Sequence, residues 1–121
     1  MNAMNILVCE DNVMTLKTIE FALKKAGYVV FKALDGDQGI RLLEEEEIDL
    51  VITDINMPEM NGEEMIERIK ANPDTEDLAI IVVSTESSET RIELLQKKGA
   101  GFVHKPFTPE ILREAVLNRI E

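Results

Sequence analysis

The chain has 121 residues, of which 45% are hydrophobic and 31% charged, which is the size and composition of one globular domain with a single core. Its formal net charge of -11, from 13 Lys and Arg against 24 Asp and Glu, argues against direct nucleic-acid binding, which depends on positive charge. No apolar run approaches the roughly 18 residues that a bilayer span requires, so we expect one domain over residues 1–121, without a membrane segment, in the cytoplasm.

The first predicted strand, near residues 5–9, is a short apolar run that is followed directly by the acidic pair Glu10 and Asp11. Cys9 is the only cysteine and cannot form an intramolecular disulfide, which fits the reducing cytoplasm. In the next segment, apolar residues recur at three- and four-residue spacing. This periodicity predicts an amphipathic helix over residues 13–26.

The rest of the chain repeats this alternation of apolar strand and amphipathic helix. Further strands are predicted near residues 28–33, 48–53, 79–84 and 101–104, and further helices near 37–46, 62–71, 88–98 and 109–120. The predicted helix starts are marked by Asp35-Gly36 and Thr108-Pro109, and the predicted helix ends by Gly27 and Gly99. The alternation indicates a doubly wound α/β fold, with five parallel strands covered on both faces by five helices.

Polar residues follow or end four of the five predicted strands. Asp54 follows the third strand, Ser84 ends the fourth and Lys105 follows the fifth. Because the carboxyl ends of parallel strands meet at one edge of a sheet, Asp54 should lie there beside Glu10 and Asp11. Crowded carboxylates repel one another unless a cation lies between them, and a cluster of oxygen ligands alone suits Mg²⁺.

Together, these residues resemble the receiver domain of two-component response regulators, and the resemblance covers essentially the whole chain. It implies a flavodoxin-like fold with strand order 2-1-3-4-5, as in the chemotaxis receiver. It also implies a phosphoryl-accepting signalling domain that catalyses only its own phosphorylation and dephosphorylation, and is not otherwise an enzyme. The expected partners are a sensor histidine kinase and a downstream protein, the latter bound through the face formed by residues 88–120.

The resemblance further implies a role for each residue at this edge. Asp54 matches the aspartate that accepts the phosphoryl group from a kinase phosphohistidine, and Ser84 and Lys105 would contact the transferred group. Before phosphorylation, Lys105 would pair with Asp54 itself. A carboxylate attacks phosphorus only when the charge repulsion between the two groups is neutralised, which is the role expected of Mg²⁺. The ligands of the ion would be Asp11 and Asp54 directly, Glu10 mainly through water, and Asn56 through its backbone carbonyl.

Two further expectations concern the switch and its timing. Phosphorylation would draw the Ser84 hydroxyl inward, and Phe102, which matches the aromatic switch residue of the family, would turn into the space that opens. The peptide bond before Pro106 would be cis. Asn56 and Glu86 would flank the path of the water that hydrolyses the acyl phosphate, and since neither is bulky and apolar, we expect rapid loss of the phosphoryl group.

Two other classes of protein share parts of this pattern. A flavodoxin-like nucleotide or flavin binder would need a Gly- or Ser/Thr-rich phosphate loop after the first strand, where Glu10, Asp11 and Asn12 would repel phosphate. A Mg²⁺-dependent phosphatase with an aspartate nucleophile would need a second acid two residues after Asp54, where Asn56 stands. Within the receiver class, the sequence leaves open whether the chain is free-standing or part of a longer regulator.

Overall fold

Five strands and five helices make up the part of the chain that the computed structural model describes, residues 3–57 and 60–120. The strands are β1 (Asn5–Cys9), β2 (Val29–Ala33), β3 (Leu50–Thr53), β4 (Ala79–Ser84) and β5 (Gly101–His104). The helices are α1 (Val13–Lys25), α2 (Gly36–Glu45), α3 (Gly62–Ala71), α4 (Glu89–Lys97) and α5 (Pro109–Ile120). Every predicted element is therefore present. No helix within the described ranges combines the length and apolarity that crossing a bilayer would take.

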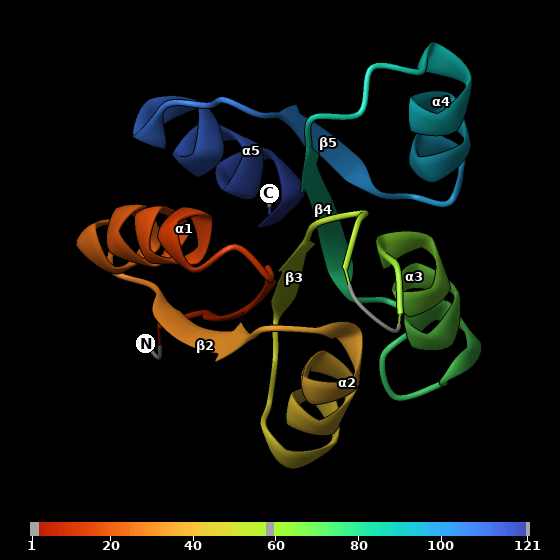
Figure 1. The fold of residues 1–121 in the computed structure, drawn as a ribbon. Helices are drawn as coiled ribbons and strands as arrows, with labels where there is room; N and C mark the ends of the chain where they lie inside the picture. Colours follow the sequence, from red (N-terminus) through yellow and green to blue (C-terminus); the bar gives the residue numbers. More distant parts are fainter. Residues whose placement is uncertain (1–2, 58–59, 121) are drawn as a thin grey trace.

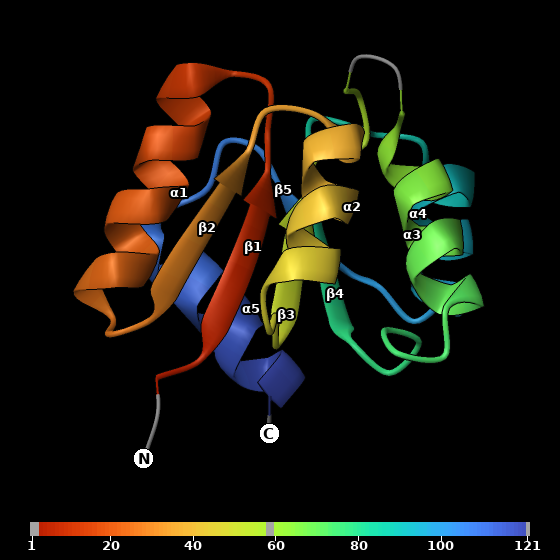
Figure 2. The same ribbon diagram turned by 90° about the horizontal axis from the view of Figure 1, so that it is seen from below.

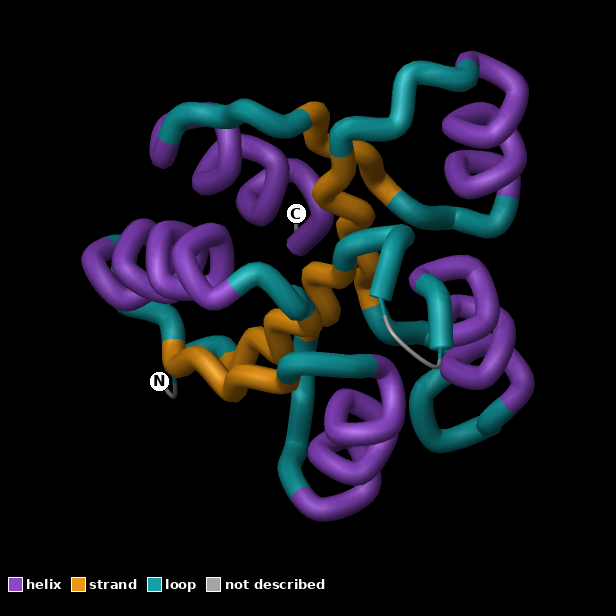
Figure 3. The backbone as a smooth tube through the Cα atoms, in the orientation of Figure 1, coloured by secondary structure: helices purple, strands orange, loops and turns teal. Residues whose placement is uncertain are grey.

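The strands form one parallel sheet in the order β2-β1-β3-β4-β5, which confirms the predicted strand order and fold class. Figure 1 looks nearly along the strands and shows α1 and α5 on one face of the sheet and α2, α3 and α4 on the other. The same layering is visible in Figure 3, where the strands separate the two groups of helices. The chain reverses its winding direction between β1 and β3, and in open α/β sheets the ligand site lies at this point.

Two apolar layers fill the space between the sheet and the helices. In β1, Ile6 and Val8 belong to the layer under α1 and α5, whereas Leu7 and Cys9 belong to the layer under α2, α3 and α4. Both sets of side chains are fully buried. A strand that is covered on both faces needs apolar residues at every position, which is why the central strands read as continuous apolar runs in the sequence.

The ends of the helices follow local backbone chemistry. The predicted starts are confirmed, since Asp35 accepts the N–H of Gln38 at 2.8 Å and the Thr108 hydroxyl accepts the N–H of Ile111 at 3.2 Å. Gly27 and Gly99 follow α1 and α4 with φ of 96° and 93°, a conformation that favours glycine. Asn12, Asn61 and Ser88 are further N-caps, which we did not predict.

The largest difference from the predicted strand starts is at β3. β3 begins at Leu50, two residues after the expected start near residue 48. The intervening Asp49 is exposed, and its carboxylate accepts the N–H of Asn5 at 2.8 Å. The apolar run therefore includes a polar contact between the beginnings of two strands, and the regular ladder starts only after it.

The loop from β3 to α3 approaches the end of its own strand closely. The Gly62 N–H donates to the carbonyl of Ile55 at 2.7 Å. A Cβ atom on Gly62 would lie 2.6 Å from the backbone oxygen of Asp54 and 2.9 Å from the Cα of Ile55, so only glycine fits without backbone movement. Pro58 and Glu59, which the sequence also places in this loop, lie outside the described residues.

Candidate functional site

The backbone ladder of the sheet places Glu10 and Asp54 next to each other. Cys9 in β1 pairs with Thr53 in β3, so the residue after each strand leaves the sheet at the same level. The N–H of Asp54 donates to the Cys9 carbonyl at 3.1 Å and thereby extends the ladder beyond the two strands. Figure 2 shows the arrowheads of β1 and β2 at the same end of the sheet, and the parallel pairing of all five strands means that β3, β4 and β5 end there too.

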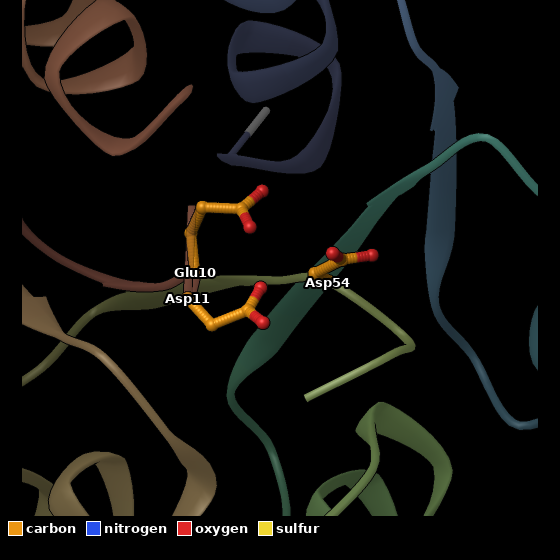
Figure 4. Close-up of side chains that lie close together, drawn as sticks. All are labelled: Glu10, Asp11 and Asp54. Atoms are coloured by element: carbon orange, nitrogen blue, oxygen red, sulfur yellow. The ribbon is translucent and has the colours of Figure 1, made fainter. Parts of the chain in front are cut away.

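Three carboxylates meet at this edge. One oxygen each from Glu10, Asp11 and Asp54 lies within 4.8 Å of the other two, and Figure 4 shows the three side chains around a common space. Glu10 and Asp54 are buried, with 1% and 9% of their surface exposed, whereas Asp11 is exposed. The predicted convergence of the three acids is confirmed, and the cluster offers the oxygen atoms that a hard metal ion requires.

Lys105 supplies the positive charge of the site. Its Nζ lies 2.5 Å from Oε1 of Glu10 and 3.3 Å from Oδ2 of Asp54. Its backbone N–H donates to the carbonyl of Ser84 at 2.9 Å, and its peptide bond to Pro106 is cis, as expected. The contact with Asp54 was expected, but the shorter contact with Glu10 was not, because spacing along the chain does not tell which of two adjacent acids a long side chain approaches.

The charges of this pair respond to burial and to each other. Burial of the carboxyl raises the pKa of Glu10 above its ordinary value, although the hydrogen bonds from Lys105 and from the N–H of Asn12 act in the opposite direction. Burial would lower the pKa of Lys105, but its hydrogen bond to Glu10 and the charge of Asp54 outweigh that effect and raise it. Lys105 therefore stays positively charged beside the acids.

Ser84, at the end of β4, is fully buried. Its hydroxyl oxygen accepts the N–H of Glu86 at 3.1 Å. The Glu86 carboxylate in turn accepts the N–H of Ser88 at 2.9 Å and a hydrogen bond from Nη1 of Arg91 at 2.8 Å. Ser84 is therefore hydrogen-bonded to the loop that leads into α4. These polar contacts stabilise the conformation of that loop.

Asn56 and Phe102, the remaining predicted residues, lie in the loop after β3 and in β5. Asn56 is exposed, two residues beyond Asp54, while Oδ1 of Asp54 accepts the N–H of Ile55 at 2.7 Å. Phe102 in β5 is half-buried and packs against the apolar layer under α2, α3 and α4. Its ring meets that of the exposed His104 edge to face, with centroids 4.7 Å apart. The structure thus brings together the acids and Lys105, and places Ser84 next to Lys105 through the backbone.

Cys9 directly precedes Glu10, but its side chain lies in the apolar core and is not part of the site. Its thiol is buried in the apolar layer, and burial, with a smaller effect from the charge of Asp35, raises its pKa to about 12. A thiol with so high a pKa stays protonated near neutral pH and is a poor nucleophile or metal ligand. Its role in this structure is therefore core packing.

Comparison with known proteins adds independent information on this arrangement. The family described as "Response regulator receiver domain" matches residues 6–117. A "Chemotaxis protein CheY homolog" of Campylobacter jejuni is 34% identical over 116 residues, covering 92% of this chain and 88% of that protein.

Two solved structures show the same fold at moderate identity. One is the chemotaxis response regulator CheY4 of Vibrio cholerae, with a TM-score of 0.90 at 27% identity over 97% of this chain and 98% of that chain. The other is a response regulator receiver domain protein from Clostridium thermocellum, with a TM-score of 0.88 at 32% identity over 97% and 94% of the two chains. In both, the similarity extends over nearly the whole chain.

Proposed function

Since this chain belongs to the response regulator receiver family, we propose that Asp54 is the residue that accepts the phosphoryl group from a sensor histidine kinase. The observation that carries the assignment is the setting of its carboxylate. One oxygen accepts the N–H of Ile55 at 2.7 Å, while the other lies 3.3 Å from Nζ of Lys105. The side chain is thus oriented by the backbone and has a cation beside its second oxygen.

In the transfer, an oxygen of Asp54 attacks phosphorus and forms the P–O bond of an acyl phosphate. The P–N bond to the kinase histidine breaks, and its electron pair returns to the imidazole nitrogen. Lys105 lies where it can pair with the oxygens of the incoming group as well as with the carboxylate. The Ser84 hydroxyl, whose oxygen accepts the N–H of Glu86, has a hydrogen that it can donate to one of these oxygens once its segment shifts toward the acceptor.

The acids fit Mg²⁺ as the metal of this site. Glu10, Asp11 and Asp54 supply three carboxylates, of which Lys105 alone can neutralise no more than one charge. Asn56 would add its backbone carbonyl, and all of these donors are oxygen atoms. When bound, the ion would reduce the charge repulsion between the attacking carboxylate and the phosphoryl oxygens.

The chain is a signalling domain, and we infer that the only reactions it catalyses are its own phosphorylation and the hydrolysis of the acyl phosphate. Residues 1–121 would act as one receiver domain in the cytoplasm, where the kinase and a downstream protein would meet it. The face of α4, β5 and α5, residues 88–120, would bind the downstream protein. Exposed apolar side chains on α4 and α5, Leu94 and Ile111, each about half exposed at 50%, support this proposal.

Neither of the other two classes gains support from the site. Glu10 and Asp11 occupy the position after β1 where a nucleotide or flavin binder would carry its phosphate loop. Asn56 is an exposed amide at the position where an aspartate phosphatase would carry a second acid.

The acceptor can be tested by labelling with acetyl phosphate in the presence of Mg²⁺. We expect one acyl phosphate per chain in the wild type and none in Asp54→Asn. Asp49→Asn is the matched control, because Asp49 precedes the same strand at the opposite edge of the sheet and should leave the labelling unchanged. Hydride trapping followed by mass mapping locates the adduct, and an adduct on any residue other than Asp54 would refute the assignment.

A further inference from the structure

Arg91, in the first turn of α4, bonds to two carboxylates that belong to different segments of the chain. Its Nη1 donates to Oε2 of Glu86 at 2.8 Å, and its Nε donates to Oε1 of Glu63 at 2.9 Å. Nη2 also donates to Glu63. All three side chains are partly buried, with 30%, 19% and 29% of Arg91, Glu86 and Glu63 exposed. One guanidinium thus joins α4 to the start of α3 and to the loop before α4.

On the α3 side, the contact reaches the segment that carries the acceptor. Glu63 follows Gly62, the residue that packs against the backbone oxygen of Asp54 and donates to the carbonyl of Ile55. The absence of a side chain at Gly62 lets these backbones touch. The position of Glu63 is therefore fixed relative to the loop that begins at Asp54.

On the α4 side, the contact reaches the hydroxyl that would respond to phosphorylation. The Glu86 carboxylate lies between Arg91 and the N–H of Ser88, and the backbone N–H of the same residue donates to the Ser84 oxygen. The hydrogen bond from Ser88 and then that from Arg91 lower the pKa of Glu86, and the hydrogen bond with Glu63 raises that of Arg91. Glu86 and Arg91 therefore remain charged over the physiological pH range.

We propose that Arg91 is a positioning residue that links the start of α3 to the β4–α4 loop and stabilises the arrangement in which the Ser84 hydroxyl accepts from Glu86. The inference rests on the proposed role of Asp54. Because we expect phosphorylation to draw the Ser84 hydroxyl toward the acceptor, contacts that hold the Ser84 segment in its present arrangement would favour the unphosphorylated conformation. Without Arg91, a larger share of the molecules adopts the conformation that reacts with a phosphodonor.

The bonding pattern separates Arg91 from an ordinary surface arginine. Arg113 in α5 approaches only Glu110, one turn away in the same helix, at 3.8 Å, which is too long for a hydrogen bond. Arg91 uses the fork of its guanidinium to bond residues 28 and 5 positions away, so it fixes two segments relative to each other. Arg113 is therefore a suitable control for the loss of one positive charge.

The test compares Arg91→Gln with Arg113→Gln in the rate of phosphorylation by acetyl phosphate at saturating Mg²⁺. We expect Arg91→Gln to react about fivefold faster than the wild type, the effect of roughly 1 kcal/mol of ion-pair energy. Arg113→Gln should react at the wild-type rate. The Mg²⁺ affinity of both variants should match the wild type, since neither residue belongs to the acid cluster, and this readout separates a shift in conformation from a change in the metal site.

Three further variants make the result specific. Glu63→Gln keeps the charge of Arg91 and weakens only its link to α3, because a neutral amide oxygen accepts less strongly from the guanidinium than a carboxylate does. It should also accelerate the reaction, and it decides the matter if Arg91→Gln does not fold. Arg91→Lys keeps the charge but not the fork, and should fall between Arg91→Gln and the wild type. In a Ser84→Ala background, Arg91→Gln should lose its effect, because the hydroxyl through which it acts is gone.

The inference is wrong if Arg91→Gln and Glu63→Gln react no faster than Arg113→Gln, or if the effect of Arg91→Gln persists unchanged in Ser84→Ala. These outcomes leave the proposed function intact, because the wild type still takes up label at Asp54. A wild type that takes up no label overturns the proposed function and this inference with it.

Discussion

Both oxygens of the Glu10 carboxylate have a hydrogen-bond donor. Oε1 is bonded to Nζ of Lys105 at 2.5 Å, and Oε2 accepts the N–H of Asn12 at 3.1 Å. A buried charge is tolerated when it is paired and hydrogen-bonded in this way, and loss of one partner is then costly. Asp11, in contrast, is exposed to solvent. Among the three acids, Asp11 is the one whose charge can be removed with least effect on the fold.

We therefore predict that Asp11→Asn keeps the stability of the metal-free protein but loses most of its response to Mg²⁺. At a concentration 100 times Kd, an ion that binds only the folded state stabilises it by about 2.7 kcal/mol. The measurement is thermal unfolding of both proteins with and without Mg²⁺, and Asp11→Asn should also fail to accept phosphate from acetyl phosphate.

Asp77→Asn is the control for this experiment. It removes the same charge from an exposed residue before the start of β4, at the edge of the sheet opposite the acids, and should keep the full Mg²⁺ response. If Mg²⁺ leaves the unfolding temperature of the wild type unchanged, the metal assignment is wrong.

At the scale of elements, the junction between β3 and α3 determines how the acceptor is presented. α3 begins at Gly62, in contact with the backbone of Asp54, and its N-cap is Asn61, whose side chain accepts the N–H of Glu64 at 2.8 Å. The first turn of the helix therefore packs directly against the end of the strand. The contact depends on glycine for its small size and not for an unusual φ.

We predict that Gly62→Ala destabilises the fold by about 2 kcal/mol, since its Cβ would meet backbone atoms that cannot rotate away. It should also slow phosphorylation by acetyl phosphate, because the clash moves the loop that starts at Asp54. Gly27→Ala is the control: its φ of 96° makes alanine unfavourable by about 1 kcal/mol, but no atom lies within 4 Å of the new Cβ. Urea unfolding should show both losses, whereas only Gly62→Ala should change the phosphorylation rate. Equal phosphorylation rates in the two variants would contradict the prediction.

The sequence predicts a strand or helix well when burial leaves a periodic or continuous apolar pattern, and predicts poorly the contacts that depend on tertiary packing. The two-sided burial of β1 and β4 leaves a continuous apolar signal, so their bounds near residues 5–9 and 79–84 were correct. The contact between Lys105 and Glu10 and the network around Arg91 were not predicted. Each depends on the twist of the sheet and on how neighbouring helices pack, and neither quantity has a period or a local motif in the sequence.

At the scale of the whole molecule, the acidic residues that give the net charge of -11 lie at favourable ends of some helix dipoles and at unfavourable ends of others. α2 ends in acidic residues and has no basic residue in its last turn, whereas α4 has Glu89 in its first turn, where a negative charge is favourable. The same substitution therefore has opposite local effects at the two sites, while its effect on the total charge is the same.

We predict that Glu45→Lys is more stable than Glu89→Lys by about 1 kcal/mol at low ionic strength, from about 0.5 kcal/mol at each helix end. Each variant changes the net charge by 2, from -11 to -9, so general self-repulsion falls equally in both and cancels in the comparison. Urea unfolding at rising NaCl concentration provides the measurement, and the difference should shrink as salt screens the charges. A difference that salt does not reduce would argue against the helix dipole as its cause.

The strand order also determines when in folding the site comes into existence. Lys105 contacts Asp54 and Glu10 across 51 and 95 positions of the chain, so no local fragment contains both the cation and the acids. Closing such long loops has an entropic cost that only the assembled sheet can offset. During synthesis, a chain from which β5 has not yet emerged therefore lacks the complete acceptor site. The acceptor site is therefore complete only when the whole domain has folded, and we expect incomplete chains not to be phosphorylated.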